Sequence, residues 1–423
     1  MENLAYIREQ FPILKQQVHG HPLAYLDSAA TAQKPMSVIE AESHFYEQDN
    51  AGVHRGAHEL AARSTLAFEQ ARTQVAKLVG VSSQPGQEEL VVTSGATGGL
   101  NLLATAFGNA SLGRGGQQAQ RFALAPGDEV VVSQAEHHSV LLPFQELCAR
   151  TGAQLKWFGL DSEGRIRSDT ADEVITERTK FVAVTHVSNV TGAITDLEPI
   201  VRRAHEVGAM VILDACQSVP HLPVDFHQLD VDFAVWSAHK MYGPTGVGFL
   251  YGKRELLEAL PPANFGGSMV ELAFIDQPAQ YMAPPARFEA GTQPVAQLVA
   301  AGVAADWMRE VGFDRIVAHE RSMTAELLQL ANIEGVRILG PKSPEHRIGT
   351  VSFEVEGVHP HDVGQFIDSR GIAIRVGHHC AQPVHRHFGV FASNRASTGV
   401  YNTLDEADRL LEAVSAVRAF FKA

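Results

Sequence analysis

The sequence predicts an α/β fold with a large, doubly wound, mostly parallel sheet domain and a smaller α+β C-terminal domain. Short apolar runs alternate with helical patterns from about residue 65 to residue 255, and several runs are apolar on both faces. Strands covered by helices on both sides have this pattern, and the alternation is typical of doubly wound folds. The pattern changes near residue 300. We therefore predict a large domain at 21–299 and a small one at 1–20 and 300–423, which includes an N-terminal helix.

The elements follow from local patterns. Pro199 and Gly208 are placed to open and close a helix over Leu197–Val207. The polar stretch Ser111–Phe122, rich in Gly and Gln, is expected to form a surface loop. The predicted strands of the large domain are Leu90–Thr93, Glu129–Ser133, Phe181–Thr185, Met210–Asp214, Phe233–Ser237 and Val247–Tyr251.

The C-terminal third has a different pattern. A long helix is expected over Val295–Val311, and an amphipathic helix over Leu404–Phe421. Between them, Thr350–Val355 and Ile372–Val376 are expected to form an isolated pair of strands. This arrangement predicts the small α+β domain.

Composition limits the class of protein. The 423-residue chain has 34 basic and 48 acidic residues, for a net charge of -14. We therefore expect neither a nucleic-acid nor an anionic-membrane partner, because either needs a basic face. No apolar run approaches the ~20 residues of a membrane-spanning helix, and the N-terminus lacks the sections of a secretory signal. Three widely spaced cysteines, Cys148, Cys216 and Cys380, fit a reducing compartment. We expect a cytoplasmic protein.

A lysine and an aspartate follow two neighbouring predicted strands. Asp214 ends one strand, and Lys240 comes three residues after Ser237, which ends another. A partly desolvated lysine can form a Schiff base, and a buried carboxylate can pair with a protonated pyridine nitrogen. The alternatives are a solvated loop lysine and an aspartate that caps the next helix. Their joint placement favours a cofactor site.

A glycine-rich turn, Thr93–Gly99, lies between a predicted strand and a helix that begins near Leu100. Small residues let backbone N–H groups approach a phosphate, and the helix dipole favours an anion. Thr97 could add a hydroxyl. Many such turns bind nothing, but the absence of Walker and GxGxxG patterns argues against nucleoside triphosphates and dinucleotides.

Two further residues suit the same chemistry. His137 follows the strand Glu129–Ser133 and could stack on an aromatic cofactor and exchange protons. A lone histidine after a strand is more often structural. Cys380 follows a strand and a glycine, so we expect it on a turn, where neighbouring histidines could help to form the nucleophilic thiolate. Cys148 and Cys216 fit inert buried residues.

The C-terminal third is rich in histidine and also carries a candidate substrate ligand. Arg395 could bind a carboxylate through two hydrogen bonds, the alternative being a surface salt bridge. With one nearby cysteine and no HExxH pattern, a structural zinc site is the weaker interpretation, and we predict no metal. The histidines concerned are His359, His361, His378, His379, His385 and His387.

Taken together, these segments resemble the SufS/CsdA-type cysteine desulfurases, which are class V, fold type I pyridoxal-phosphate enzymes. Each match is short, but the set runs in family order through nearly the whole chain. The matches are Leu26–Thr31, Val53–Gly56, Glu136–His138, Val187–Asn189, Asp214–Gln217, Ser237–Lys240, Phe288–Thr292, Arg375–Cys380 and Arg395–Ser397.

The resemblance implies a homodimeric enzyme that uses pyridoxal 5'-phosphate to convert L-cysteine to L-alanine, with persulfide on Cys380, for iron–sulfur cluster assembly. Lys240 would carry the cofactor, with His137 stacked on its ring, and Thr292 would reach the phosphate of the other subunit. Arg395, Asn189 and Arg375 are the implied substrate-binding residues. The implied cofactor-binding residues are Ala96, Thr97, His137, Asn189, Asp214, Gln217, Ser237, His239, Lys240 and Thr292.

The chain departs from the family pattern at two positions. Gly98 stands where an acidic residue is common, and Gln293 stands where a proline is common. Both changes bear on local loop geometry only. His359–Asp362 resembles the branch of the family that is served by a small zinc-containing sulfur acceptor of the SufU type, rather than a SufE-type acceptor. The resemblance implies that His361 engages this partner.

Three alternatives stay open from the sequence. A selenocysteine lyase uses the same scaffold and depends less on Cys380. An ordinary class V aminotransferase or a kynureninase-like enzyme needs no such cysteine. A scaffold or regulatory protein could keep the cofactor without catalysis.

Overall fold

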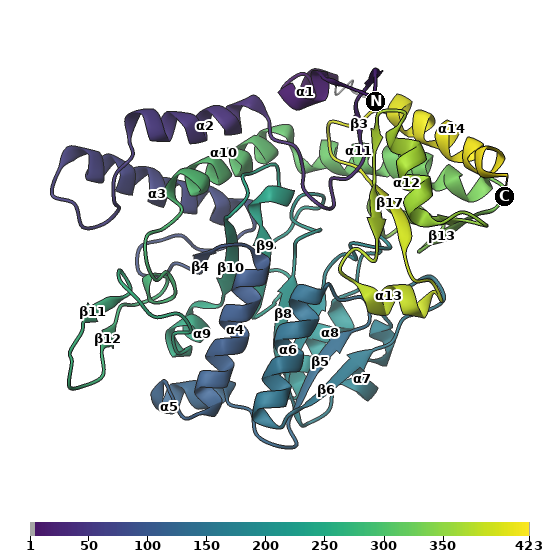
Figure 1. Cartoon of the computed structure of the whole chain (residues 1–423). Helices are drawn as coiled ribbons and strands as arrows, with labels where there is room; N and C mark the ends of the chain where they lie inside the picture. Colours follow the sequence, from purple (N-terminus) through teal and green to yellow (C-terminus); the bar gives the residue numbers. More distant parts are fainter. Residues whose placement is uncertain (1–4, 423) are drawn as a thin grey trace.

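The computed structural model describes residues 5–422, and its centre is a sheet with the strand order β4-β10-β9-β8-β7-β5-β6 (Figure 1). The strands from β9 to β6 are parallel, whereas β10 is antiparallel to both β4 and β9. The sheet is therefore doubly wound and mostly parallel, as predicted. Its strands are β4 (Leu90–Thr93), β5 (Glu129–Ser133), β6 (Gln154–Phe158), β7 (Thr179–Thr185), β8 (Met210–Asp214), β9 (Phe233–Ser237) and β10 (Gly248–Gly252).

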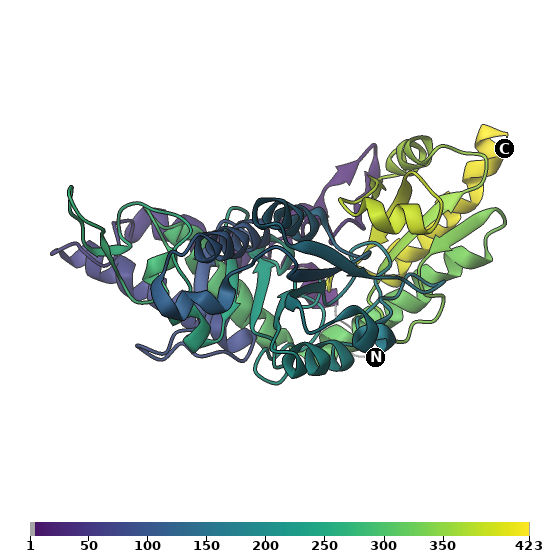
Figure 2. The same cartoon turned by 90° about the horizontal axis from the view of Figure 1, so that it is seen from below.

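Side chains alternate between the two faces of this sheet. In β7, Phe181 packs into the core beneath α4 (Ala96–Ser111) and α6 (His138–Thr151), whereas Val182 packs into the core on the other face. Figures 1 and 2 show α4 and α6 running together along the sheet. The second face is covered by α3 (Glu59–Leu78), α8 (Glu198–Glu206) and α10 (Val295–Val311), whose apolar residues share one core with it.

The predicted strands of the large domain are confirmed. Four agree at both ends, β7 begins two residues earlier, and β10 lies one residue further along the chain. The strand β6 was not predicted. It lies at the edge of the sheet, where Gln154 and Trp157 are exposed, so it lacks the continuous apolar pattern of its buried neighbours.

The stretch Ser111–Phe122 lies mostly at the surface, as predicted, but the prediction that it is a loop throughout is wrong. This stretch contains the helical turns α5 (Gly116–Ala119) and η2 (Gln120–Phe122). Ala119 and Phe122 are fully buried, and the Phe122 ring stacks on Phe107 with 5.7 Å between ring centroids. Two apolar anchors hold a segment whose composition is otherwise that of a loop.

The C-terminal part contains a second sheet, ordered β13-β14-β17-β16, with α12 (Pro360–Asp368) and α14 (Leu404–Phe421) packed together against it. The predicted pairing of Thr350–Val355 with Ile372–Val376 is wrong. The latter stretch splits into β15 (Ile372–Ala373) and β16 (Arg375–Gly377), and β17 (Ser393–Ser397) lies between β14 (Thr350–Val355) and β16. The strand β17 is polar yet wholly buried, so its sequence gave no strand signal.

The N-terminal segment contains a helix, as predicted, within its described residues. It forms α1 (Ala5–Arg8) and the turn η1 (Pro12–Lys15), and residues 1–4 of the predicted helix lie outside the described residues. The strand β3 (Ala24–Tyr25) pairs with β15, and Ala24 joins the C-terminal core, while α10 joins the main core. The division into domains at 21–299 stays a prediction.

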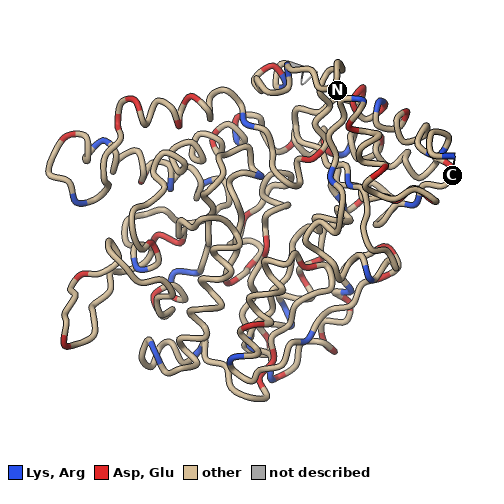
Figure 3. Tube along the Cα trace, in the orientation of Figure 1, with Lys and Arg blue, Asp and Glu red and all other residues tan. Residues whose placement is uncertain are grey.

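The other described elements connect or flank these layers. They are α2 (Met36–Gln48), α7 (Ala171–Val174), α9 (Arg254–Ala259), α11 (Phe313–Leu327), α13 (Gln382–His387), β1 (Gln17–Val18), β2 (His21–Pro22), β11 (Val270–Leu272), β12 (Gln280–Tyr281), β13 (Val336–Leu339), η3 (Ser168–Thr170), η4 (Ala238–Lys240), η5 (Ala286–Phe288) and η6 (Leu328–Asn332). Figure 3 shows basic and acidic positions interspersed along the described chain. Within residues 5–422, no helix is long and apolar enough to cross a bilayer, and no three potential ligands cluster as a metal site.

Candidate active site

A cavity of about 440 Å³ lies where the parallel strands of the main sheet end. Ligands of open α/β sheets bind at this edge, because the loops after the strands meet there. The cavity brings together residues that lie up to 368 positions apart in the chain, from Asp27 to Arg395. The predicted site residues that line it are Ala96, Thr97, His137, Asn189, Asp214, Gln217, Ser237, His239, Lys240, Arg375, Cys380 and Arg395.

Thr292 lies elsewhere. It is exposed and lines a separate cavity of about 410 Å³ with residues of the turn Gly52–His54. Within one chain, therefore, it does not join the other predicted residues.

One end of the site is formed by the turn after β4, which contributes Ala96 and Thr97 to the cavity. The Ala96 N–H, at the start of α4, donates a hydrogen bond of 2.9 Å to the Ser237 hydroxyl at the end of β9. Gly95 has a φ of 141° and lies against Gly248, where an added Cβ would come within 2.4 Å of the Gly95 Cα. Two glycines thus let β10 approach the turn closely, which holds the start of α4, including Thr97, beside Ser237.

Asp214 is the carboxylate of the cavity wall. It is buried at the end of β8, and its Oδ1 accepts a hydrogen bond of 3.0 Å from the Cys216 N–H. That contact resembles the capping alternative, but a turn follows Asp214 and not a helix. A buried carboxylate at this position can pair with the protonated nitrogen of a heteroaromatic ring.

Lys240 ends the turn η4 in a basic part of the cavity. Lys34 donates a hydrogen bond of 3.1 Å to the backbone carbonyl of His239, and burial lowers the pKa of Lys34 to about 8. Burial, together with Lys240 and Lys34, lowers the pKa of His239 to about 4. Lys240 shares the cavity with Ser237 and the first residues of α4, whose helix dipole favours an anion at this end.

His137 is held as a neutral imidazole. It caps α6, and its Nδ1 accepts a hydrogen bond of 3.1 Å from the Ser139 N–H. Burial, followed by the charge of Lys240, lowers its pKa to about 4. An uncharged ring between Lys240 and Cys380 suits stacking against another aromatic ring.

Arginines and an unpredicted aspartate form the opposite wall. Arg395 is buried on β17, and its Nη2 lies 3.2 Å from Asp27 Oδ1, while Arg375 lies 3.8 Å from the same carboxylate. Burial raises the pKa of Asp27, although both arginines oppose this effect. The Arg395 Nε is buried without a hydrogen-bond partner, which leaves a donor for a carboxylate ligand.

Hydrogen bonds to the backbone fix the turn that carries Cys380. Cys380 is exposed and has a φ of 55°, in the left-handed region, as does His379 at 49°. The Cys380 carbonyl accepts a hydrogen bond of 2.7 Å from the His138 N–H, and the His379 carbonyl accepts one of 2.8 Å from Asn189 Nδ2. Backbone strain of this kind persists only where surrounding contacts impose it.

The other two thiols differ from Cys380. Cys148 and Cys216 are buried, and burial raises the pKa of Cys148 to about 11 and that of Cys216 further. A thiolate is therefore strongly disfavoured at both. Burial also lowers the pKa of His379, with Arg395 adding to the effect. Arg375, Arg395 and Lys240 are basic residues that line the cavity together with Cys380.

Buried polar atoms test whether this site fits pyridoxal phosphate. Gln217 donates from Nε2 to the Ala29 carbonyl at 2.9 Å, but its Oε1 is buried without a partner. An orphaned acceptor in the wall implies a donor on a ligand. The turn at the start of α4, the buried Asp214, Lys240 and the neutral imidazole of His137 surround one cavity, so the residues fit the cofactor.

Sequence reasoning assigned no role to two acidic residues: Asp27, which lines the cavity, and Glu136, whose charge interacts with that of Asp214. Asp27 and Glu136 lie in the matched segments Leu26–Thr31 and Glu136–His138, so the matches were the signal that could have found them. Glu136 is fully buried, and its Oε1 accepts hydrogen bonds from the Ser133 hydroxyl at 2.5 Å and from the Thr185 N–H at 3.0 Å.

The fold and the site together define a class of protein. The sequence matches the family described as Aminotransferase class-V over residues 24–410. The chain belongs to this family of pyridoxal-phosphate enzymes of fold type I. Within the family, its relatives are cysteine desulfurases.

The chain is 47% identical to "Probable cysteine desulfurase 2" of Mycobacterium leprae, with 99% of this chain and 97% of the relative covered. It is 42% identical to the cysteine desulfurase of Cronobacter sakazakii, with 97% of both chains covered. Among solved structures, the cysteine desulfurase CsdA from Escherichia coli superimposes with a TM-score of 0.86, at 36% identity and 99% coverage of both chains.

Proposed function

We propose that the chain converts L-cysteine to L-alanine and stores the sulfur as a persulfide on Cys380, for iron–sulfur cluster assembly in the cytoplasm. The observation that carries this proposal is the presence of Lys240, Asp214 and Cys380 around one cavity, with Cys380 the exposed thiol. The full-length similarity to cysteine desulfurases supports the same reaction.

The residues at the ends of the main-sheet strands are proposed to bind the cofactor and to transfer protons. Pyridoxal phosphate, when bound, supplies an electron sink for the carbanion of the amino acid. Lys240 holds the cofactor and moves the α-proton of the substrate, and Asp214 would hold the proton on the ring nitrogen. The remaining predicted ligands of the cofactor are Ala96, Thr97, Ser237 and His239 at the phosphate, and His137, Asn189 and Gln217 around the ring.

The opposite wall handles the substrate. Arg395 would bind the substrate carboxylate through its free Nε and its fork, with Asn189 and Arg375 beside it. The Cys380 thiolate then attacks the substrate sulfur. An S–S bond forms, the Cβ–S bond breaks, and a proton completes the methyl group of alanine.

Thr292 and His361 belong to the proposal as contacts with other chains. Thr292 is exposed outside the cofactor cavity, which is consistent with a homodimer in which it reaches the partner's phosphate. His361 is exposed on α12, which packs against β16, the strand that leads to Cys380. A zinc-containing SufU-type acceptor is proposed to engage His361.

The test is mass spectrometry of the cofactor-loaded protein after brief exposure to L-cysteine. We expect a mass gain of about 32 Da, one sulfur atom, on the peptide that carries Cys380, with one alanine per sulfur. The Cys380→Ala variant should gain no mass and the Cys148→Ala variant should behave as the wild type. Modification confined to Cys148 or Cys216 would contradict the assignment, and unimpaired turnover of selenocysteine alone by Cys380→Ala would favour a selenocysteine lyase.

A further inference from the structure

The strand that leads to the phosphate turn has one unpaired edge. β4 is the outermost strand of the main sheet, and within residues 5–422 its only strand neighbour is β10. β4 ends at Thr93 and runs directly into the turn Gly95–Thr97. Backbone groups on the outer edge of a sheet need partners when they are buried.

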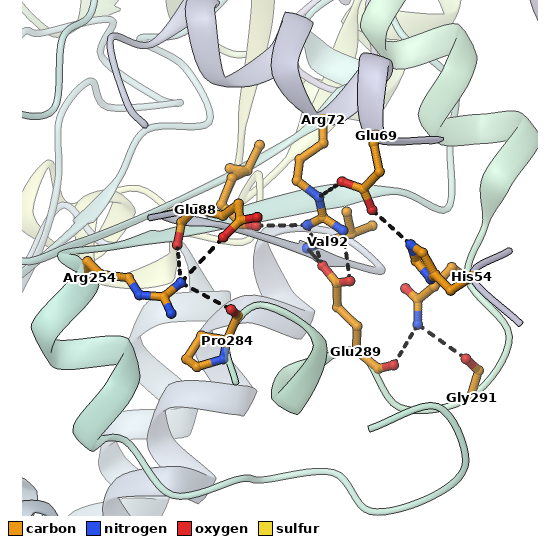
Figure 4. A network of polar contacts seen from close by, with 11 residues as sticks. His54, Glu69, Arg72, Glu88, Val92, Arg254, Pro284, Glu289 and Gly291 are labelled. Carbon is orange, nitrogen blue, oxygen red and sulfur yellow. Dashed lines mark hydrogen bonds and ion pairs between the residues drawn. The ribbon is translucent and has the colours of Figure 1, made fainter. Parts of the chain in front are cut away.

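A buried ion pair takes the place of the missing strand. Arg72 of α3 grips Glu289 with two hydrogen bonds, Nη1 to Oε1 at 2.7 Å and Nη2 to Oε2 at 2.9 Å. The same two groups contact β4: Arg72 Nη1 donates to the Leu90 carbonyl at 2.8 Å, and the Val92 N–H donates to Glu289 Oε1 at 2.8 Å (Figure 4). The pair therefore offers β4 one donor and one acceptor, as a neighbouring strand would.

The chain that follows Glu289 is braced around Thr292. Gln293 Nε2 donates to the Glu289 carbonyl at 2.8 Å and to the Gly291 carbonyl at 3.3 Å. The Gly291 N–H donates to the Gly267 carbonyl at 2.9 Å, and Gly291 has a φ of 86°, which favours glycine. The side-chain amide of Gln293 thus closes the turn, which gives this departure from the family pattern a physical role.

The other end of the network reaches His54, which lines the same cavity as Thr292. Arg72 Nε lies 3.2 Å from Glu69, and Glu69 lies 2.8 Å from His54 Nε2. Figure 4 shows this chain of contacts running from Glu289 through Arg72 and Glu69 to His54. His54 and Thr292 line the same cavity. One network therefore fixes the surroundings of Thr292 on both sides.

We propose that Arg72 and Glu289 are positioning residues that set where Thr292 meets the cofactor phosphate of the partner subunit. The same pair is hydrogen-bonded to β4. Arg72 and Glu289 therefore support both the phosphate turn of their own subunit and the Thr292 that contacts the partner's cofactor. This inference rests on the proposed function, since it needs both pyridoxal phosphate and a second subunit.

The phosphate group supplies the discriminating experiment. Apo-protein is titrated with pyridoxal phosphate and with pyridoxal, which lacks the phosphate. We expect Glu289→Gln and Glu289→Asp to raise the dissociation constant for pyridoxal phosphate about tenfold, the effect of losing one good hydrogen bond. Neither variant should change the affinity for pyridoxal. Glu289→Asp keeps the charge and shortens the side chain by one methylene, so it serves if Glu289→Gln does not fold.

Glu88→Gln is the matched control. Glu88 lies 3.6 Å from Arg254 and is drawn in the same view, but it contacts neither Arg72 nor Glu289. This variant should leave both affinities unchanged. Equal losses for pyridoxal phosphate and pyridoxal in the Glu289 variants, or no loss for either, would overturn the positioning role. A wild-type chain that binds neither compound would overturn the proposed function itself.

A mixed dimer tests the crossing between subunits. A wild-type subunit is paired with one that carries both Lys240→Ala and Glu289→Gln, so that only the wild-type subunit can link the cofactor covalently. Its site receives Thr292 from the altered subunit, and its affinity for pyridoxal phosphate should fall as in the Glu289→Gln homodimer. A partner with Lys240→Ala alone is the control. An unaffected wild-type site, or a protein that binds the cofactor as a monomer, would refute action across the interface.

Discussion

Replacement of Glu136 by glutamine tests whether this buried side chain is protonated at neutral pH. Glu136 is fully buried, and burial is the main cause that raises its pKa from 4.5 to about 8, with the charge of Asp214 adding to the effect. Its Oε1 takes two hydrogen bonds, whereas Oε2 has no partner among the described residues. At neutral pH the side chain is therefore a neutral acid, which glutamine imitates in shape and charge.

The magnitude follows from the displacement of the pKa. A tenfold change in proton affinity is worth about 1.4 kcal/mol. A rise from 4.5 to about 8 therefore makes ionised Glu136 on the order of 5 kcal/mol less favourable in the folded chain than in the unfolded chain. The folded chain keeps a proton that the unfolded chain releases, so the contribution of Glu136 to stability falls as pH rises from 4.5 to about 8.

The assay is denaturant unfolding of apo-protein at several pH values and one protein concentration. Titration of the other groups is common to both proteins and cancels in their difference. Near pH 5, Glu136→Gln should differ little from the wild type. Between pH 5 and about pH 8, the unfolding free energy of Glu136→Gln minus that of the wild type should increase by up to about 5 kcal/mol. A difference that stays constant over this range, or one that shrinks with rising pH, would refute a protonated Glu136.

Three further predictions concern a substrate contact, an ion pair and a helix cap. Arg395→Lys should raise the KM for L-cysteine about 100-fold, because an ammonium cannot replace the fork and the free Nε; alanine release measures this, and a change below threefold would contradict it. The pKa of His205 is raised above 6.5, chiefly by its hydrogen bond to Asp232 at 3.0 Å. This contribution is present below pH 6.5 and is lost as pH rises through the raised value, so His205→Gln should lower the unfolding free energy at pH 5.5 more than at pH 8.5, and equal losses would exclude the pair. Thr403 caps α14 in a capping box with Glu406, so Thr403→Ala should cost about 1 kcal/mol in denaturant unfolding, and an unchanged midpoint would exclude the cap.

Much of the fold was predictable because local patterns carry it. The strands β8 and β9 are apolar on both faces, which required helices on both sides of the sheet. The positions of Asp214 and Lys240 after these strands then placed both at one edge, since parallel strands share their carboxyl ends. Placement beside Cys380, by contrast, came from resemblance, because no local pattern relates residues that lie so far apart in the sequence.

The sequence by itself determined which strands are buried and which reactive groups follow them, because periodicity and position along a strand are properties of short segments. Only the tertiary structure decided that polar β17 lies inside, that Asp27 meets Arg395, and that burial raises the pKa of Glu136. Each of these depends on contacts between distant segments. Burial and charge are set by what surrounds a group in space, and the neighbouring residues in the chain do not specify those surroundings.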